Sequence, residues 1–124
     1  MLKWAYLVAG SIVGGILRYV FAGAVYKRLG AGFPYGTLAV NLTGCLLIGF
    51  FYSLAEEKFL LGPDERVLLM TGFCGAYTTF STLILESSNL ISSGEWLRSL
   101  SNVGVSIVAG FLLLRAGAMI GKLV

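Results

Sequence analysis

A polar stretch interrupts an otherwise apolar segment in the second half of the chain. Residues 71–82 read Thr-Gly-Phe-Cys-Gly-Ala-Tyr-Thr-Thr-Phe-Ser-Thr and combine two glycines with four threonines and a serine. This composition is unusual for a lipid-facing helix and favours a helix that is broken near Thr78 and Thr79. In hydrocarbon, a backbone N–H or C=O freed by such a break is costly unless protein, water or an ion binds it. The stretch therefore predicts a polar site at membrane depth.

A second polar pattern follows Pro34. Thr37, Asn41 and Gly44 recur at helical spacing and so share one face of a helix. An asparagine in such a stripe either clamps two helices together by a hydrogen bond or offers its amide donors to a passing anion. Spacing alone leaves these two hypotheses equally open.

Two charged residues also fall inside apolar segments. Arg18 lies past the middle of the first segment, where a guanidinium is costly unless it snorkels to the interface or faces a water-filled vestibule. We favour the vestibule, in which its charge would raise the local concentration of anions. Glu86 lies near the far end of the third segment. It is either part of a polar track with Thr82 or a carboxylate at the membrane interface.

The elements that must position these side chains are membrane helices. Of the 124 residues, 57% are hydrophobic and 12% are charged, and the mean hydropathy is +0.88. Because about 20 apolar residues cross a bilayer, the chain has room for four helices and no separate aqueous domain. We therefore expect a single all-α transmembrane domain over residues 1–124. Its helices should lie near residues 4–26, 35–54, 67–90 and 100–123, with the third helix broken at its centre.

Composition also argues against several classes of function. The chain has no histidine, and no nucleophile–base pair or metal-ligand cluster is visible, so an enzyme is not expected. The net charge is only +3 and the basic residues are scattered, which argues against nucleic-acid binding. Cys45 and Cys74 form neither a disulfide framework nor a metal site by their spacing.

The basic residues outside the spans show almost no bias toward one side of the membrane. One side would receive Lys3, Lys58, Arg66 and Lys122, and the other Lys27, Arg28 and Arg98. Without a positive-inside bias the chain can insert in both orientations and pair with its own inverted copy. Such an antiparallel, dual-topology homodimer has a two-fold axis in the membrane plane, and its functional site is expected near the midplane.

Three motifs, taken together, resemble the Fluc (CrcB-type) fluoride channels. They are Gly14-Gly15-Ile16-Leu17-Arg18-Tyr19, residues 36–44 and residues 72–82, and the resemblance covers essentially the whole chain. It implies passive export of fluoride across the plasma (inner) membrane by an antiparallel homodimer with two pores. It further implies a structural sodium ion at the dimer centre, held by the backbone carbonyls of Gly75 and Thr78 from each copy. Carbonyl oxygens are hard ligands that suit an alkali cation.

The resemblance also assigns residues to the fluoride path. Phe80 would present the electropositive edge of its ring to the anion, and Asn41 would donate from its amide. The full expected set is Asn41, Phe80, Leu83, Ser106, Thr82 and Glu86 along the pore and Arg18 in the vestibule.

The chain departs from the usual residues of that family at three positions. Leu83 stands where a second phenylalanine is usual, which leaves one ring edge for each pore. Ala76 replaces a second glycine, and this would strain the backbone only if the position requires a positive φ. Gly110 stands where a serine is common.

Two other functions fit a chain of this size. A small dual-topology multidrug exporter also has four helices, but it needs a proton-coupling carboxylate in its substrate cavity, and the first helix carries Arg18 and no acid. A non-conducting membrane accessory protein would need no ion selectivity. Liposome flux of fluoride, chloride and lipophilic cations would separate the three.

Overall fold

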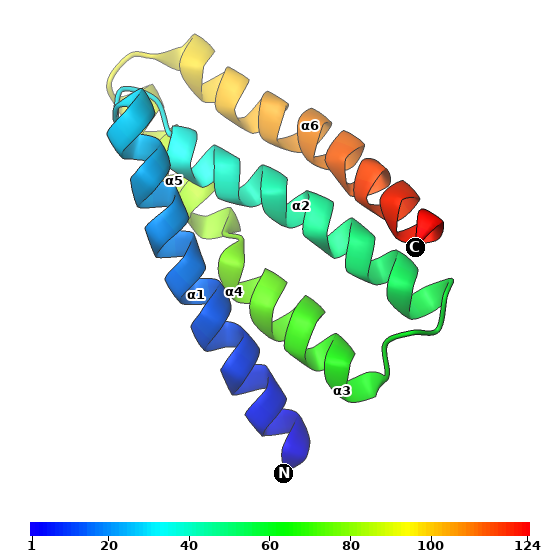
Figure 1. The fold of residues 1–124 in the computed structure, drawn as a ribbon. Helices are drawn as coiled ribbons and strands as arrows, with labels where there is room; N and C mark the ends of the chain where they lie inside the picture. The colour runs from blue at the N-terminus through cyan, green and yellow to red at the C-terminus, as the bar shows by residue number, and fades with distance from the viewer.

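The chain is entirely helical in the computed structural model, which describes residues 1–124 (Figure 1). Helix α1 spans Leu2–Leu29, α2 spans Tyr35–Glu56 and α6 spans Trp96–Leu123. The segment between α2 and α6 contains α3 (Pro63–Arg66), η1 (Val67–Cys74), α4 (Gly75–Tyr77) and α5 (Phe80–Ser92). Four helical spans, Leu2–Leu29, Tyr35–Glu56, Pro63–Ser92 and Trp96–Leu123, are long and apolar enough to cross a membrane. The prediction of an all-α chain with four transmembrane helices is confirmed.

Glycine and proline residues mark the ends of the helices. Gly30 ends α1 with a φ of 81°, and Gly94 has a φ of 79° in the turn before α6, which are conformations that glycine adopts without a steric penalty. Pro34 precedes α2, and Pro63 opens α3 at a position where its missing N–H leaves no helical bond unmade. These residues explain why the connections are short.

The third span changes its backbone conformation twice. It is π-helical over Val67–Cys74, a form that is rare and often found at functional sites. After α4 the backbone is extended at Thr78 (φ −92°, ψ 162°) and at Thr79 (φ −153°, ψ 115°), before α5 begins. The sequence pattern marked these two threonines but gave no sign of the π-helical turns.

Glycines allow the backbones of two helix pairs to touch. Gly10 and Gly14 of α1 lie against the backbone of η1 at Phe73, and Gly49 and Gly117 bring α2 and α6 together in the same way. At each of these four positions a Cβ atom would collide with a carbonyl oxygen of the neighbouring helix. Small residues at such contacts drive helix association in lipid, where the hydrophobic effect between helices is absent.

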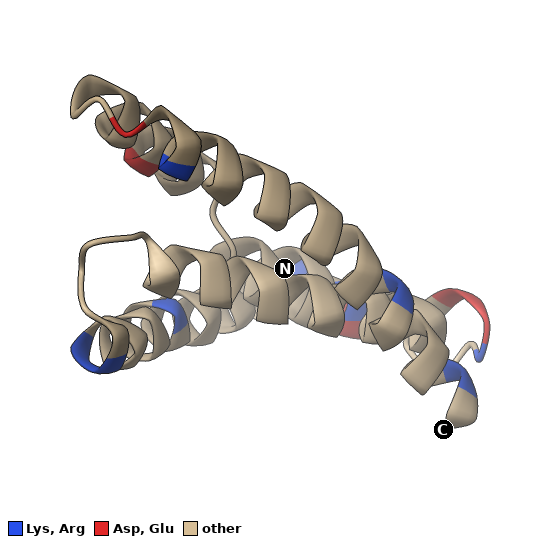
Figure 2. Cartoon of the chain, turned by 90° about the horizontal axis from the view of Figure 1, so that it is seen from above, with Lys and Arg blue, Asp and Glu red and all other residues tan.

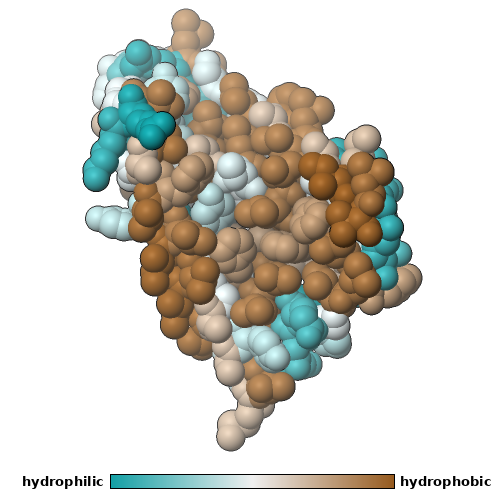
Figure 3. All heavy atoms as spheres, viewed as in Figure 1, coloured by the Kyte–Doolittle hydropathy of each residue, from teal (hydrophilic) through white to brown (hydrophobic).

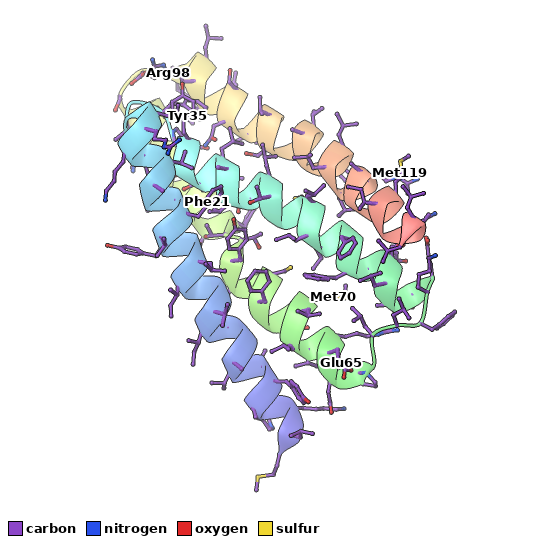
Figure 4. All side chains as sticks on the ribbon, viewed as in Figure 1. Phe21, Tyr35, Glu65, Met70, Arg98 and Met119 are labelled. Atoms are coloured by element: carbon purple, nitrogen blue, oxygen red, sulfur yellow. The ribbon has the colours of Figure 1, made fainter.

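The exterior of the chain is largely apolar. Only 20 of the 124 residues are buried, and Figure 3 shows hydrophobic residues over most of one face, with hydrophilic residues toward the ends. Most charged residues lie near helix ends and loops (Figure 2), and Figure 4 places Tyr35 and Arg98 at one end of the bundle and Glu65 at the other. Three ion pairs join groups at these ends, namely Arg66–Glu56, Arg98–Glu95 and Lys122–Glu57. The chain is a multi-pass integral membrane protein.

Candidate functional site

The side chain of Asn41 on α2 binds the backbone of Thr79, where the third span is extended. The Thr79 N–H donates to Asn41 Oδ1 at 2.8 Å, and Asn41 Nδ2 donates to the Thr79 carbonyl at 3.0 Å. In a continuous α-helix the Thr79 N–H would instead bond the carbonyl of Gly75. Asn41 therefore supports the interruption and leaves the Gly75 carbonyl without its usual helical donor.

Thr78, the residue before Thr79, is also held by polar contacts. The Thr78 N–H and hydroxyl both donate to the Cys74 carbonyl, at 3.1 and 2.9 Å. The Thr78 carbonyl accepts from Arg18 Nη1 of α1 at 3.3 Å. A guanidinium thus serves as the hydrogen-bond partner of this oxygen.

Helix α2 contacts the end of α4 through a tyrosine. The Tyr77 hydroxyl lies 2.9 Å from Thr43 Oγ1. Because the Thr43 hydroxyl donates its only proton to the Ala39 carbonyl at 2.7 Å, Tyr77 is the donor in this pair. Gly44, on the next position of α2, lies against the methyl group of Thr78 and leaves no space for a Cβ.

Four of the residues predicted for the pore surround one hollow of about 310 Å³. They are Asn41, Phe80, Leu83 and Ser106. The Phe80 ring is 76% exposed, whereas Leu83 is buried at 7%. The Ser106 hydroxyl is buried without a hydrogen-bond partner. The hollow therefore combines an amide, an exposed ring and a free hydroxyl against an apolar wall.

The other three predicted residues surround a different hollow, of about 880 Å³. They are Arg18, Thr82 and Glu86. Thr79 belongs to the walls of both hollows. Its hydroxyl accepts from the Thr82 N–H at 3.2 Å and lies 3.0 Å from the Thr82 hydroxyl, which borders the larger hollow.

Glu86 belongs to a cluster of hydroxyl groups. Its Oε1 accepts from the Thr37 hydroxyl at 2.8 Å and from the Tyr26 hydroxyl at 3.1 Å, while its Oε2 is buried without a partner. The sequence reasoning placed Thr37 on the polar stripe of α2 but missed Tyr26 and Tyr77. The sequence did give a general indication of both, because a tyrosine inside an apolar span usually finds a hydrogen-bond partner for its hydroxyl.

Two of the unusual residues are explained by the geometry. Phe59 is the only residue other than glycine with a positive φ, so Ala76 occupies its position without backbone strain. At Gly110 a Cβ would lie 3.3 Å from Cys45 Sγ, so the glycine makes room for the thiol on α2. Leu83 completes an apolar part of the smaller hollow, next to Phe80.

The interruption offers backbone oxygens and no cluster of metal-binding side chains. No group of three or more histidine, cysteine, aspartate or glutamate side chains could hold a metal. The carbonyls of Gly75 and Thr78 are hard, neutral ligands, and Gly75 is exposed on the surface of the chain. Neutral oxygens of this kind suit hard cations better than transition metals.

Comparison with known proteins places the chain in a family. The family model described as "CrcB-like protein, Camphor Resistance (CrcB)" matches residues 5–118. A protein of Maridesulfovibrio salexigens named "Fluoride-specific ion channel FluC" is 41% identical over 100% of this chain and 98% of its own length. A protein with the same name from Solidesulfovibrio magneticus is 40% identical over 98% of this chain and 98% of its own length. Another from Chlorobium phaeobacteroides is 46% identical over 93% of this chain and 89% of its own length. The resemblance seen in the motifs is confirmed, and the chain belongs to the CrcB-like family.

Proposed function

We propose that this chain is a fluoride-selective ion channel of the plasma (inner) membrane, through which fluoride leaves the cytoplasm down its gradient. Its relatives with the printed name "Fluoride-specific ion channel FluC" match nearly the full chain, and four of its helices can span a bilayer. The chain is thus a transport protein and not an enzyme. The observation that carries the proposal is the hollow shared by Asn41, Phe80 and Ser106.

These three residues can replace the water around a small anion. Asn41 Nδ2 has two N–H groups and uses one for the Thr79 carbonyl, so the second remains available. The Ser106 hydroxyl has no partner within the chain. The edge of the Phe80 ring carries partial positive charge. Donors that line one small hollow favour an ion that can approach them closely, whereas Leu83 offers a larger anion no compensating contact.

The larger hollow supplies the approach to this site. Arg18 and Lys27 in its wall create a positive potential that attracts anions from solution. Glu86 has one oxygen occupied by Thr37 and Tyr26, which limits its effect on a passing anion. The hydroxyls of Thr79 and Thr82 provide exchangeable donors between the two hollows.

The functional unit is an antiparallel, dual-topology homodimer. A single chain buries few hydrophobic residues (Val40, Ala55, Cys74, Tyr77 and Leu83), and Phe80 in the candidate pore is 76% exposed. A second, inverted copy would cover this ring and complete the wall of the hollow. The nearly equal numbers of basic residues at the two ends permit insertion in both orientations.

A sodium ion fits the centre of this dimer as a structural cofactor. Its ligands would be the carbonyls of Gly75 and Thr78 from each copy. The support for this site is the Gly75 carbonyl, whose helical donor is taken by Asn41. The ion would bind the Gly75 oxygen, which the interrupted span leaves without its helical hydrogen bond, and would share the Thr78 oxygen with Arg18.

Flux from liposomes tests this function. Purified protein should release fluoride rapidly from vesicles loaded with fluoride, and the same protein should release almost no chloride. Vesicles without protein give the background leak. Equal release of both anions would overturn the fluoride selectivity. Proton-coupled uptake of a lipophilic cation would indicate a multidrug exporter. The absence of any flux would indicate a non-conducting accessory protein.

A further inference from the structure

Tyr77 is placed directly before the extended part of the third span. It is the last residue of α4, is only 6% exposed, and stacks on Phe73 with 5.7 Å between ring centroids and 11° between ring planes. A phenylalanine would make the same stacking contact. The hydroxyl is therefore not needed to fill the space, and its role must lie in the bond that it makes.

That bond crosses from the third span to α2. The Tyr77 hydroxyl donates to Thr43 Oγ1 at 2.9 Å, because the Thr43 proton is already used for the Ala39 carbonyl. The Thr43 hydroxyl is thereby fixed against its own helix, and its oxygen presents a lone pair to the Tyr77 hydroxyl. A neutral hydrogen bond inside the membrane has no water to compete with it, so it restrains the ring more firmly than it would on a wet surface.

The Tyr77–Thr43 bond and the Asn41–Thr79 bonds hold the chain on the two sides of Thr78. Both sets of bonds come from one stretch of α2, and Gly44 of the same stretch contacts the Thr78 methyl group. With its neighbours fixed, Thr78 has little freedom to turn its peptide group. The direction of its carbonyl is therefore set by these contacts with α2 together with Arg18 of α1, which donates to it at 3.3 Å.

We propose that Tyr77 is a positioning residue that, through Thr43, aims the Thr78 carbonyl at the cation site and so sets the affinity of that site. This inference rests on the proposed sodium site. It adds a named hydrogen bond, outside the ligand set, on which sodium binding depends.

The dependence of the dimer on sodium tests the inference. The rate of dimer dissociation is measured at a series of sodium concentrations, with a large organic cation keeping the ionic strength constant. We expect Tyr77→Phe to raise the sodium concentration for half-maximal protection by about tenfold, since the bond is lost in both copies. At saturating sodium the dissociation rate should equal that of the wild type.

Matched variants separate positioning from packing. Thr43→Ser keeps the hydroxyl and should retain the wild-type sodium dependence, whereas Thr43→Val should resemble Tyr77→Phe. The double variant should be no weaker than either single one, because both remove the same bond. Tyr52→Phe serves as the control, since Tyr52 is an exposed tyrosine of the same helix and lies outside the Tyr77–Thr43 bond.

Each other outcome counts against the proposal in a recognisable way. A wild-type sodium midpoint in Tyr77→Phe, with the wild type itself sodium-dependent, overturns the positioning role and leaves the sodium site standing. Faster dissociation of Tyr77→Phe even at saturating sodium shows a purely structural role. A wild-type dimer that does not respond to sodium overturns the sodium site and the inference with it.

Discussion

The carboxamide of Asn41 pairs with both backbone groups of Thr79, which lies 38 positions away in the sequence. It acts on Thr79 as a neighbouring strand would, with one donor and one acceptor. Asn41 also lies in the wall of the hollow that contains Phe80 and Ser106. The hydrogen-bond clamp is therefore observed, and the anion donor remains a compatible role for the second N–H of the same amide.

This double role predicts that Asn41→Ala affects both stability and flux. The variant loses two hydrogen bonds and leaves backbone groups of Thr79 unpaired in the membrane, so unfolding should become easier by about 2 kcal/mol. Fluoride flux in liposomes should fall below the detection limit. Asn89→Ala, on the exposed face of α5, should change neither quantity. An Asn41→Ala protein with wild-type flux would remove Asn41 from the pore.

Phe80 should matter for flux and not for the stability of the isolated chain. Its ring is 76% exposed, so Phe80→Ala removes few contacts within the chain. Loss of the ring edge should reduce fluoride flux by about tenfold or more, which corresponds to about 1.4 kcal/mol or more of ion stabilisation. Phe111→Ala is the matched control, because that ring is 69% exposed on α6 and borders neither hollow. Equal flux in the two variants would contradict the pore assignment.

Arg18 should act through its charge. Arg18→Gln should lower fluoride flux several-fold at low ionic strength, and the difference from the wild type should shrink above about 0.1 M salt, where the Debye length falls to about 10 Å. Flux measured over a series of salt concentrations, with an impermeant electrolyte, gives the comparison. Arg115→Gln, which is exposed on α6, is the control. A salt-independent loss would indicate that Arg18 acts through its bond to the Thr78 carbonyl instead.

The contact between α2 and α6 should be sensitive to one added methyl group. In Gly117→Ala the new Cβ meets the Leu46 carbonyl, so the helices must separate, and overpacking of this kind costs about 1–3 kcal/mol. Thermal unfolding in detergent should show a lower midpoint. Gly104→Ala on the same helix adds its Cβ in open space and should keep the wild-type midpoint. The same midpoint in both variants would argue against close packing at Gly117.

Much of the architecture could be predicted because it depends on local composition. The apolar segments predicted the four spans, and the glycines and hydroxyls of residues 71–82 marked the place where the backbone becomes extended. The π-helical turns of η1 could not be predicted, because residues 67–74 carry no local pattern that distinguishes a π-helix from an α-helix.

The site was predicted less completely than the fold. Helical spacing placed Thr37 and Asn41 on one face, but it gave no information on which distant group each would bind. The bonds from Tyr26 to Glu86 and from Tyr77 to Thr43 join separate helices and depend on their packing. The division of the expected pore residues between two hollows has the same origin, since it reflects how α1, α2, α5 and α6 are placed around Thr79.

The interruption at Thr78 and Thr79 also has an electrostatic consequence. Because α5 begins at Phe80, a helix N-terminus lies beside the smaller hollow, in the middle of the span Pro63–Ser92. The aligned peptide dipoles of such a helix place a partial positive charge, equivalent to about half an elementary charge, at that end. The backbone thus contributes positive potential deep in the membrane. No side chain has to be ionised for this contribution, so it stays constant at every pH at which the helix is folded.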